Sequence, residues 1–278
     1  MQHANFSQLR CVVGIIRSIS VIFVSGLLFS CTQSPTGRSQ VLLFSEAEMA
    51  SLGQSSFEQI KGQEKVSTSS GDNAYIQCVT NQLVTVLPPS YRQSPWEVVV
   101  FDSPEVNAFA LPGGKIGVYS GLLKVAKTQD QLASVIGHEM AHVLAKHSNE
   151  RVSRTQLTNM GLGVADAALG QSGLREPAMA ALGLGVQVGY LLPYDRQQEV
   201  ESDRLGLELM AQAGFRPEEA VTMWRNMSAA SSGQQPPELL STHPSHGSRI
   251  QELNALMPQA QSVYQQAHSQ GKVPSCRR

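Results

Sequence analysis

The sequence lacks an excess of charge of either sign. Its 21 Lys and Arg residues balance 22 Asp and Glu residues, which leaves a formal net charge of -1 at pH 7. Domains that bind nucleic acid carry a clear surplus of basic residues, because they must neutralise phosphates. We therefore expect no nucleic-acid partner and no partner recognised by charge alone.

Long hydrophobic runs are also missing. The apolar run at residues 19–29 has about eleven residues, whereas a membrane-spanning helix needs about 20. A second stretch, residues 177–193, is nearly apolar, but its alanines and glycines contribute little hydrophobicity and Gln187 interrupts it. For residues 157–192 we expect a mobile helical lid or a buried helical pair rather than a membrane span.

The N-terminal run is typical of a bacterial export signal. Arg10 and Arg17 precede it, and it ends in Leu28-Phe29-Ser30-Cys31, which resembles the lipobox of a lipoprotein. We expect residues 1–30 to be a signal peptide and Cys31 to carry the lipid. An ordinary signal peptide or an uncleaved anchor is the alternative.

The residues after the signal suggest where the protein is held. Residues 31–45, rich in Ser, Thr, Gln and Gly, are expected to be a tether. Thr32 follows the lipobox cysteine where an aspartate would be expected for the inner membrane. We therefore predict a lipid anchor in the outer membrane, with the protein facing the periplasm.

Cysteine is scarce, with four in the chain. If Cys11 is removed with the signal and Cys31 is acylated, Cys78 and Cys276 remain. An oxidising periplasm would allow these two to pair. Both a disulfide and two separate thiols stay open, because the sequence does not give their distance.

The stretch His138-Glu139-Met140-Ala141-His142 has the pattern HExxH. On an α-helix four residues advance about 6 Å and return to within about 40° of the starting direction. Both histidines therefore project from one face and can share one zinc ion. Zinc lowers the pKa of a water from ~15.7 towards ~7, and Glu139 is placed to take its proton as it attacks a peptide carbonyl.

The sequence around HExxH predicts a buried helix. Thr128 can cap it, Gln131 can complete a capping box, and Asp130 lies in the positive first turn. Nearly the whole circumference of this helix is apolar. Polar side chains on a buried helix need partners, and a metal ion is one.

Upstream of HExxH we expect two helices and three strands. Ser45 and Glu48 form a capping box that starts the first helix, and apolar residues from 75 to 87 recur at helical spacing. The strands are expected at the following ranges: 96–101, 106–111 and 115–119. Together they predict a small antiparallel sheet, whose exposed edge could accept an extended peptide as another strand.

A second motif lies on a helix that Asp195 and Gln198 are expected to cap. Glu199 and Asp203 are four residues apart and share a face, so Glu199 can be a third metal ligand while Asp203 holds a histidine ring. Glu201 points to the opposite side and is expected to be a solvated or scaffold residue.

These motifs together resemble the family of zinc metallopeptidases that includes the heat-shock protease HtpX, the CAAX prenyl endopeptidases and the beta-barrel assembly-enhancing protease. The resemblance rests on these stretches: Asn107-Ala108-Phe109-Ala110 with Gly113-Gly114, His138-Glu139-x-x-His142 continuing to His147, Arg196-x-x-Glu199-x-x-x-Asp203 with Gly206, and His243-Pro244 with Arg249-Ile250. It implies a mostly helical α+β domain of the gluzincin type, with the small sheet beside the HExxH helix. We expect one such domain at residues 46–278.

The resemblance also implies the chemistry. His138, His142 and Glu199 would bind one zinc ion per chain, with Glu139 as general base. Misfolded or unassembled envelope proteins would be the substrates. No long C-terminal repeat domain for docking partners is expected, and a lipoprotein chaperone for outer-membrane proteins with little proteolysis is the alternative function.

Two further histidines need an assignment. His243 is expected near the zinc, where it either stabilises the oxyanion or occupies the open coordination position. His147 follows His138 by nine residues, one short of the metzincin spacing, and is expected to be structural.

Overall fold

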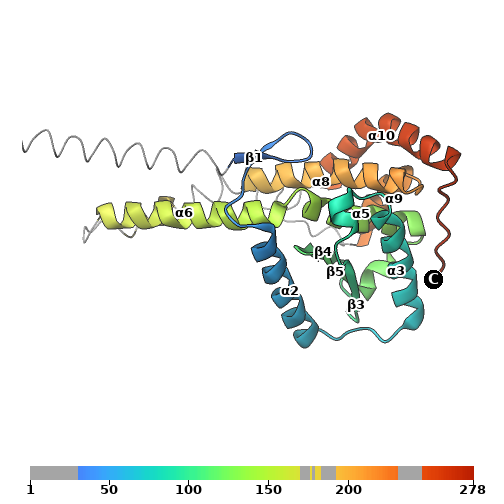
Figure 1. Cartoon of the computed structure of the whole chain (residues 1–278), viewed down its shortest axis with the longest axis horizontal. Coiled ribbons are helices and arrows are strands. Elements are labelled where there is room, and N and C mark those ends of the chain that lie inside the picture. Colours follow the sequence, from blue (N-terminus) through green and yellow to red (C-terminus); the bar gives the residue numbers. More distant parts are fainter. Residues whose placement is uncertain (1–30, 170–175, 177–178, 183–191, 231–245) are drawn as a thin grey trace, which may run out of the picture.

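The computed structural model describes residues 31–169, 176, 179–182, 192–230 and 246–278. These residues form a mostly helical structure with two small sheets, which confirms the predicted α+β class (Figure 1). One long helix, α6 (His147–Leu169), extends away from the other elements.

The segment expected to be a tether is instead folded. β1 (Cys31–Gln33) and β2 (Ser39–Val41) pair antiparallel, with Cys31 opposite Val41. We call residues 31–41 the N-terminal hairpin. The hairpin forms because polar residues in its turn bond to buried carboxylates elsewhere in the chain, as described below. Whether residues 31–45 also serve as a tether from a lipid stays a prediction.

Two helices follow the hairpin. α2 (Glu46–Gln63) begins with the predicted capping box, in which Ser45 and Glu48 bond reciprocally, and it buries Phe57 completely. α3 (Ser70–Val84) buries an apolar face against the core. A four-residue helix, α4 (Pro89–Arg92), leads to the sheet.

The sheet contains the three predicted strands, but it is mixed rather than antiparallel. β5 (Lys115–Tyr119) lies in the centre, parallel to β3 (Glu97–Phe101) and antiparallel to β4 (Ala108–Leu111). The chain passes from β3 to the far edge before it returns, so β3 and β5 run in the same direction. Among the described residues, β4 has one edge without a strand partner.

α5 (Gln129–Leu144) carries HExxH and packs against α8 (Leu192–Gln212). Thr128 caps α5 as predicted, but the Gln131 side chain accepts a hydrogen bond from the backbone of Lys127, so the box is not reciprocal. α8 begins before Asp195, which therefore lies within the helix and is not its cap.

The contact between α5 and α8 depends on glycine. A Cβ at Gly206 on α8 would lie 2.8 Å from the backbone nitrogen of His138, and one at Gly137 would lie 3.1 Å from the carbonyl oxygen of Gly206. The first contact is shorter than real side chains make, and the second is tighter than most. The two glycines let the helix backbones touch beside the first histidine of the motif.

Two more helices complete the described part of the chain: α9 (Glu218–Ala230) and α10 (His246–Ser269). In the ranges that the structure describes, no helix is long and apolar enough to cross a membrane. The lid or buried helical pair was predicted for residues 157–192, of which 157–169 form the last part of α6. Residues 170–175, 177–178 and 183–191 lie outside the described ranges, so the choice between a lid and a helical pair stays a prediction.

The C-terminal segment is fixed to α3 by a disulfide bond. Cys78 and Cys276 are joined, with their Cα atoms 5.7 Å apart. This decides between the two alternatives that the sequence left open.

Candidate metal centre

Three side chains converge where α5 meets α8. His138 Nε2 and His142 Nε2 lie 3.1 Å apart. Glu199 Oε2 lies 3.2 Å from His138 Nε2, and Glu199 Oε1 lies 3.3 Å from His142 Nε2. A tetrahedral ion with bonds of about 2.0–2.1 Å separates its ligand atoms by about 3.3–3.4 Å. One ligand atom from each of the three groups lies within 4.8 Å of the others, so the three groups could hold one metal ion.

Asp203 supports His138. Its Oδ1 lies 2.9 Å from His138 Nδ1, on the side of the ring away from the ligand nitrogen. Burial lowers the pKa of His138, but the hydrogen bonds to Asp203 and Glu199 outweigh burial and raise it to about 10 in the metal-free protein. A carboxylate at this position keeps Nε2 directed at the metal.

Glu139 lies on the accessible side of α5. From Gln131 to Ala145, all residues are buried except Glu139, His142 and Val143, which are partly exposed. A cavity of about 160 Å³ adjoins this stripe and is lined by His142, Val143 and residues of α2 and of the turn after β4. His142 is therefore the one of the three candidate ligands that lines this cavity.

Arg249 is a site residue to which the sequence assigned no role. It extends from α10 and bonds to Asp203 Oδ2 at 2.7 Å and Glu199 Oε2 at 2.5 Å, while its guanidinium lies 3.9 Å from the ring centroid of Trp224. Arg249 is almost fully buried. It pairs with both buried carboxylates and fixes their positions, because buried charges are tolerated only when they are paired.

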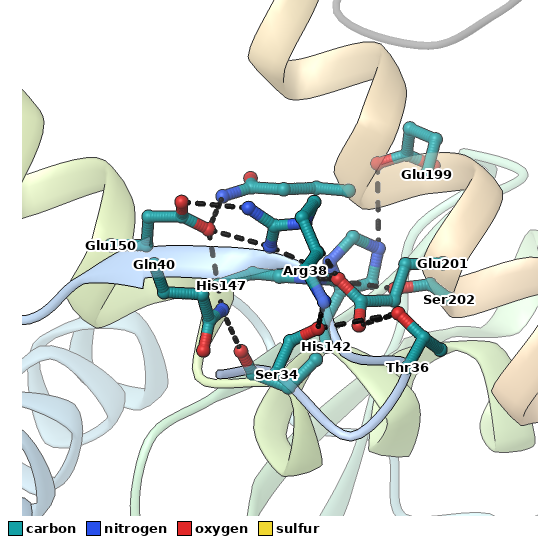
Figure 2. Close-up of polar contacts among 12 residues, drawn as sticks. Ser34, Thr36, Arg38, Gln40, His142, His147, Glu150, Glu199, Glu201 and Ser202 are labelled. Atoms are coloured by element: carbon teal, nitrogen blue, oxygen red, sulfur yellow. Dashed lines mark hydrogen bonds and ion pairs between the residues drawn. The ribbon is translucent and has the colours of Figure 1, made fainter. Parts of the chain in front are cut away.

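Glu201 is not solvated. It is buried on α8, where its Oε2 lies 3.1 Å from His147 Nε2, and His147 Nδ1 lies 2.9 Å from His142 Nδ1 (Figure 2). The expectation of a solvated residue failed because the face opposite Glu199 is covered by α6 and the N-terminal hairpin. The alternative expectation, a scaffold residue, agrees with this position.

His147 is not on the HExxH helix. α5 ends at Leu144, and Lys146 takes a left-handed conformation with φ of 56° before α6 begins at His147. The turn directs His147 back onto His142. Burial lowers the pKa of His147 to about 4, although the hydrogen bond to Glu201 opposes this, so the ring is neutral at pH 7.

Two predicted site residues have no described side-chain geometry. His243 lies within residues 231–245, outside the described part of the chain. Cys31 is the first residue of β1, and only its backbone pairing is described. The roles predicted for both stay predictions.

The fold and the site define a class of protein. Two histidines one helical turn apart and a glutamate from a second buried helix form a group that could hold one metal ion on an α+β scaffold, and a further glutamate follows the first histidine. The model of peptidase family M48 matches residues 70–257 of this sequence. The chain therefore belongs to peptidase family M48.

Individual relatives agree with the family. The chain is 39% identical to the mitochondrial metalloendopeptidase OMA1 of Schizosaccharomyces pombe over 189 residues, which are 67% of this chain and 53% of the relative. It is 31% identical to the mitochondrial metalloendopeptidase OMA1 of Homo sapiens over 262 residues, covering 89% and 50%. The beta-barrel assembly-enhancing protease of Escherichia coli is 30% identical over 164 residues, covering 57% and 34%. The chain thus spans about half or less of the length of these curated relatives.

Proposed function

We propose that this protein is a zinc metalloendopeptidase that cuts internal peptide bonds of protein substrates. The convergence of His138 Nε2, His142 Nε2 and the Glu199 carboxylate carries the proposal: the two nitrogens are 3.1 Å apart, each has a Glu199 oxygen within 3.3 Å, and one ligand atom from each residue lies within 4.8 Å of the others. Three such ligands are what a catalytic zinc ion takes from the protein. Membership of peptidase family M48 supports the same activity.

The residues around the centre have separate tasks. His138, His142 and Glu199 would hold the zinc ion, which would supply a Lewis acid that polarises the scissile carbonyl and lowers the pKa of water. Glu139 accepts the proton of the attacking water and passes it to the leaving amine. Its partial exposure beside the ligands suits this exchange with substrate.

β4 is the element best placed to align a substrate. It packs against α5, and among the described residues its outer edge carries no strand partner. An extended peptide can add to such an edge through backbone hydrogen bonds, which do not depend on side-chain identity. This mode of binding suits an enzyme that acts on unfolded segments of many proteins.

Glu139→Gln tests the peptidase activity. The amide keeps the shape of the side chain but accepts no proton, so kcat on unfolded casein should fall by about 100-fold or more, while elemental analysis still finds one zinc per chain. Glu58→Gln, at an exposed glutamate on α2, is the matched control and should cut normally. A Glu139→Gln variant with full activity, or cutting by wild type that a chelator does not reduce, would contradict the proposal.

We further propose that the protein acts in quality control at the periplasmic face of the outer membrane, held by a lipid on Cys31. The export signal and lipobox support this location, and the Cys78–Cys276 disulfide suits an oxidising compartment. The name of the Escherichia coli relative, beta-barrel assembly-enhancing protease, supports a role connected with the assembly of beta-barrel proteins. We propose misfolded or unassembled envelope proteins as the substrates. The mitochondrial names of the other relatives describe those proteins, and the lipobox favours bacterial export for this chain.

Cys31→Ala tests the anchor. Without a modified cysteine the protein should move from the membrane fraction into the soluble periplasm, whereas Cys276→Ala should leave it in the membrane. Retention of the Cys31→Ala variant in membranes after an alkaline wash would contradict a lipid as the attachment.

His243 is proposed to act beside the zinc in one of two ways. If it stabilises the oxyanion, His243→Ala should lower kcat by about 100-fold; if it occupies the open coordination position, the same change should raise activity. His268→Ala is the control, because His268 contacts the carbonyl of Gly214 instead. Unchanged activity would return His243 to a structural role.

The alternative function is a lipoprotein chaperone that holds outer-membrane proteins and cuts little. The partly exposed stripe on α5 and the outer edge of β4, which no strand covers in the described residues, would also suit reversible binding of unfolded chains. The casein experiment separates the two functions. If the protein is a chaperone, three samples should bind unfolded casein equally well: the wild type, the Glu139→Gln variant and the protein after removal of zinc. None of the three should cut the casein.

A further inference from the structure

We propose that Arg38 of the N-terminal hairpin is a positioning residue for the metal ligand His142, on which it acts through Glu201 and His147. The inference rests on the proposed zinc centre and adds a support that comes from outside the two metal-binding motifs. Figure 2 shows Thr36 and Arg38 of the hairpin close to Glu201.

The hydrogen bonds from His142 to Glu201 have one consistent arrangement of protons. When His142 Nε2 faces the metal, its Nδ1 carries the proton and donates to His147 Nδ1 across 2.9 Å. His147 Nε2 then donates to Glu201 Oε2 across 3.1 Å. The Glu201 carboxylate therefore fixes the ring orientation of His142 through an intervening imidazole.

Each of the two metal-binding histidines is therefore oriented by a carboxylate, one directly and one through a second imidazole. His138 is oriented by a carboxylate in direct contact, Asp203, whereas the Nδ1 of His142 contacts the imidazole of His147. Residues that orient a metal-binding histidine contribute to metal affinity because they fix its tautomer and direction. His147 and Glu201 together occupy for His142 the position that Asp203 occupies for His138.

The hairpin holds Glu201 in place. Glu201 Oε1 accepts a hydrogen bond from Thr36 Oγ1 at 2.6 Å, and Glu201 Oε2 accepts one from Arg38 Nε at 3.0 Å. The two terminal nitrogens of Arg38 each donate to Glu150 at 2.7 Å. Glu150 and Glu201 are buried on α6 and α8, so a single planar guanidinium joins the two helices behind His147.

The hairpin and the segment after it are seated by further specific bonds. Gln40 Nε2 donates to the carbonyl of Ala145 at 2.6 Å, directly before the turn that presents His147. Two residues beyond the hairpin, the Leu43 backbone nitrogen donates to Ser153 Oγ at 2.8 Å on α6. Arg38 is therefore held by its own segment and is not a surface side chain that happens to reach a carboxylate.

The zinc affinity of the full chain, purified in detergent, tests the inference. Competition with a chromogenic chelator should give Arg38→Gln a zinc dissociation constant about 10- to 100-fold above wild type, and the visible spectrum of the cobalt-substituted protein should change. Arg38→Lys should recover part of the loss, because one ammonium can still pair with a carboxylate but cannot span both. A folded Arg38→Gln variant with the zinc affinity and cobalt spectrum of wild type would overturn the proposal.

Thr36→Val keeps the experiment decisive if Arg38→Gln does not fold. It removes one bond to Glu201 while leaving the ion pairs, and should weaken zinc by about 3- to 10-fold; unchanged affinity would overturn the proposal. Arg216→Gln is the control, since Arg216 binds the buried Asp130 at the other end of α5 and should alter stability without altering zinc affinity. Wild-type protein that binds no zinc would instead refute the proposed function, so the two failures differ.

Discussion

The two histidines of the site are supported from different parts of the molecule. On the His138 side, Asp203 lies one helical turn from Glu199 on the same helix and contacts the ring directly. On the His142 side, the support passes through His147 and Glu201 to Arg38, which is 163 residues from Glu201 in the sequence. The residue that orients His138 can therefore be found from helical spacing, whereas the residues that orient His142 depend on a hairpin far away in the sequence.

The largest effect on zinc binding should come from the loss of Glu199, because its carboxylate contacts both histidines. Glu199→Ala leaves two protein ligands where catalytic zinc requires three, so the purified variant should lose its zinc on dialysis, as elemental analysis can show. Glu208→Ala, on the same helix with a bond to Gln212, should retain one zinc per chain. Zinc retained at full occupancy by Glu199→Ala would mean that this glutamate is not a ligand.

A smaller effect is expected from Asp203, which supports only His138. Asp203→Asn should weaken zinc about 10- to 100-fold, because the amide can no longer act as a charged acceptor for His138 Nδ1–H. The measurement is the same chelator competition used for Arg38. Affinity within twofold of wild type would show that the direct support is dispensable.

The double variant Asp203→Asn with Thr36→Val tests whether the supports of His138 and His142 are independent. If the two supports act on different histidines, the losses of zinc-binding free energy should add to within about 0.5 kcal/mol. A departure from additivity well above this value would show that the two supports depend on each other. The contact between His138 and His142 would then connect them.

The smallest effect on zinc affinity should come from removal of the disulfide bond. Replacement of Cys78 and Cys276 by serine should lower the free energy of unfolding by about 2–5 kcal/mol, measured with urea, because the bond joins residues 198 positions apart in the sequence. Zinc affinity should stay within twofold of wild type, since the bond joins the C-terminal segment to α3, away from the three ligands. A tenfold weaker site would mean that the disulfide also positions the metal centre.

The parts of the site that the sequence could predict are those with short-range spacing. His138 and His142 share a helical face because they are four residues apart, and so do Glu199 and Asp203; the structure brings all four together. The cap at Thr128 follows from equally local rules. Helical periodicity was enough to place each pair on one face, and the resemblance to the zinc metallopeptidases implied that the two pairs meet at one zinc ion.

The rest could not be predicted because it depends on contacts between distant segments. Arg249 reaches Glu199 and Asp203 from another helix, and no spacing rule relates them. Glu201 was assigned to a solvated or scaffold surface because a helix pattern shows which way a side chain points but not what covers it. The parallel pairing of β3 and β5 was missed for a similar reason, since strand direction depends on the path of the connection between them.

The N-terminal hairpin would also limit how far the proposed enzyme could reach. If a lipid is attached to Cys31, six residues lie between the lipid-bearing residue and Arg38, so the two are at most seven residue steps apart, or about 25 Å of fully extended chain. The hairpin uses most of that length in pairing with itself. The catalytic domain would then stay next to the bilayer, and cleavage would be confined to segments of unfolded protein that lie close to the membrane surface.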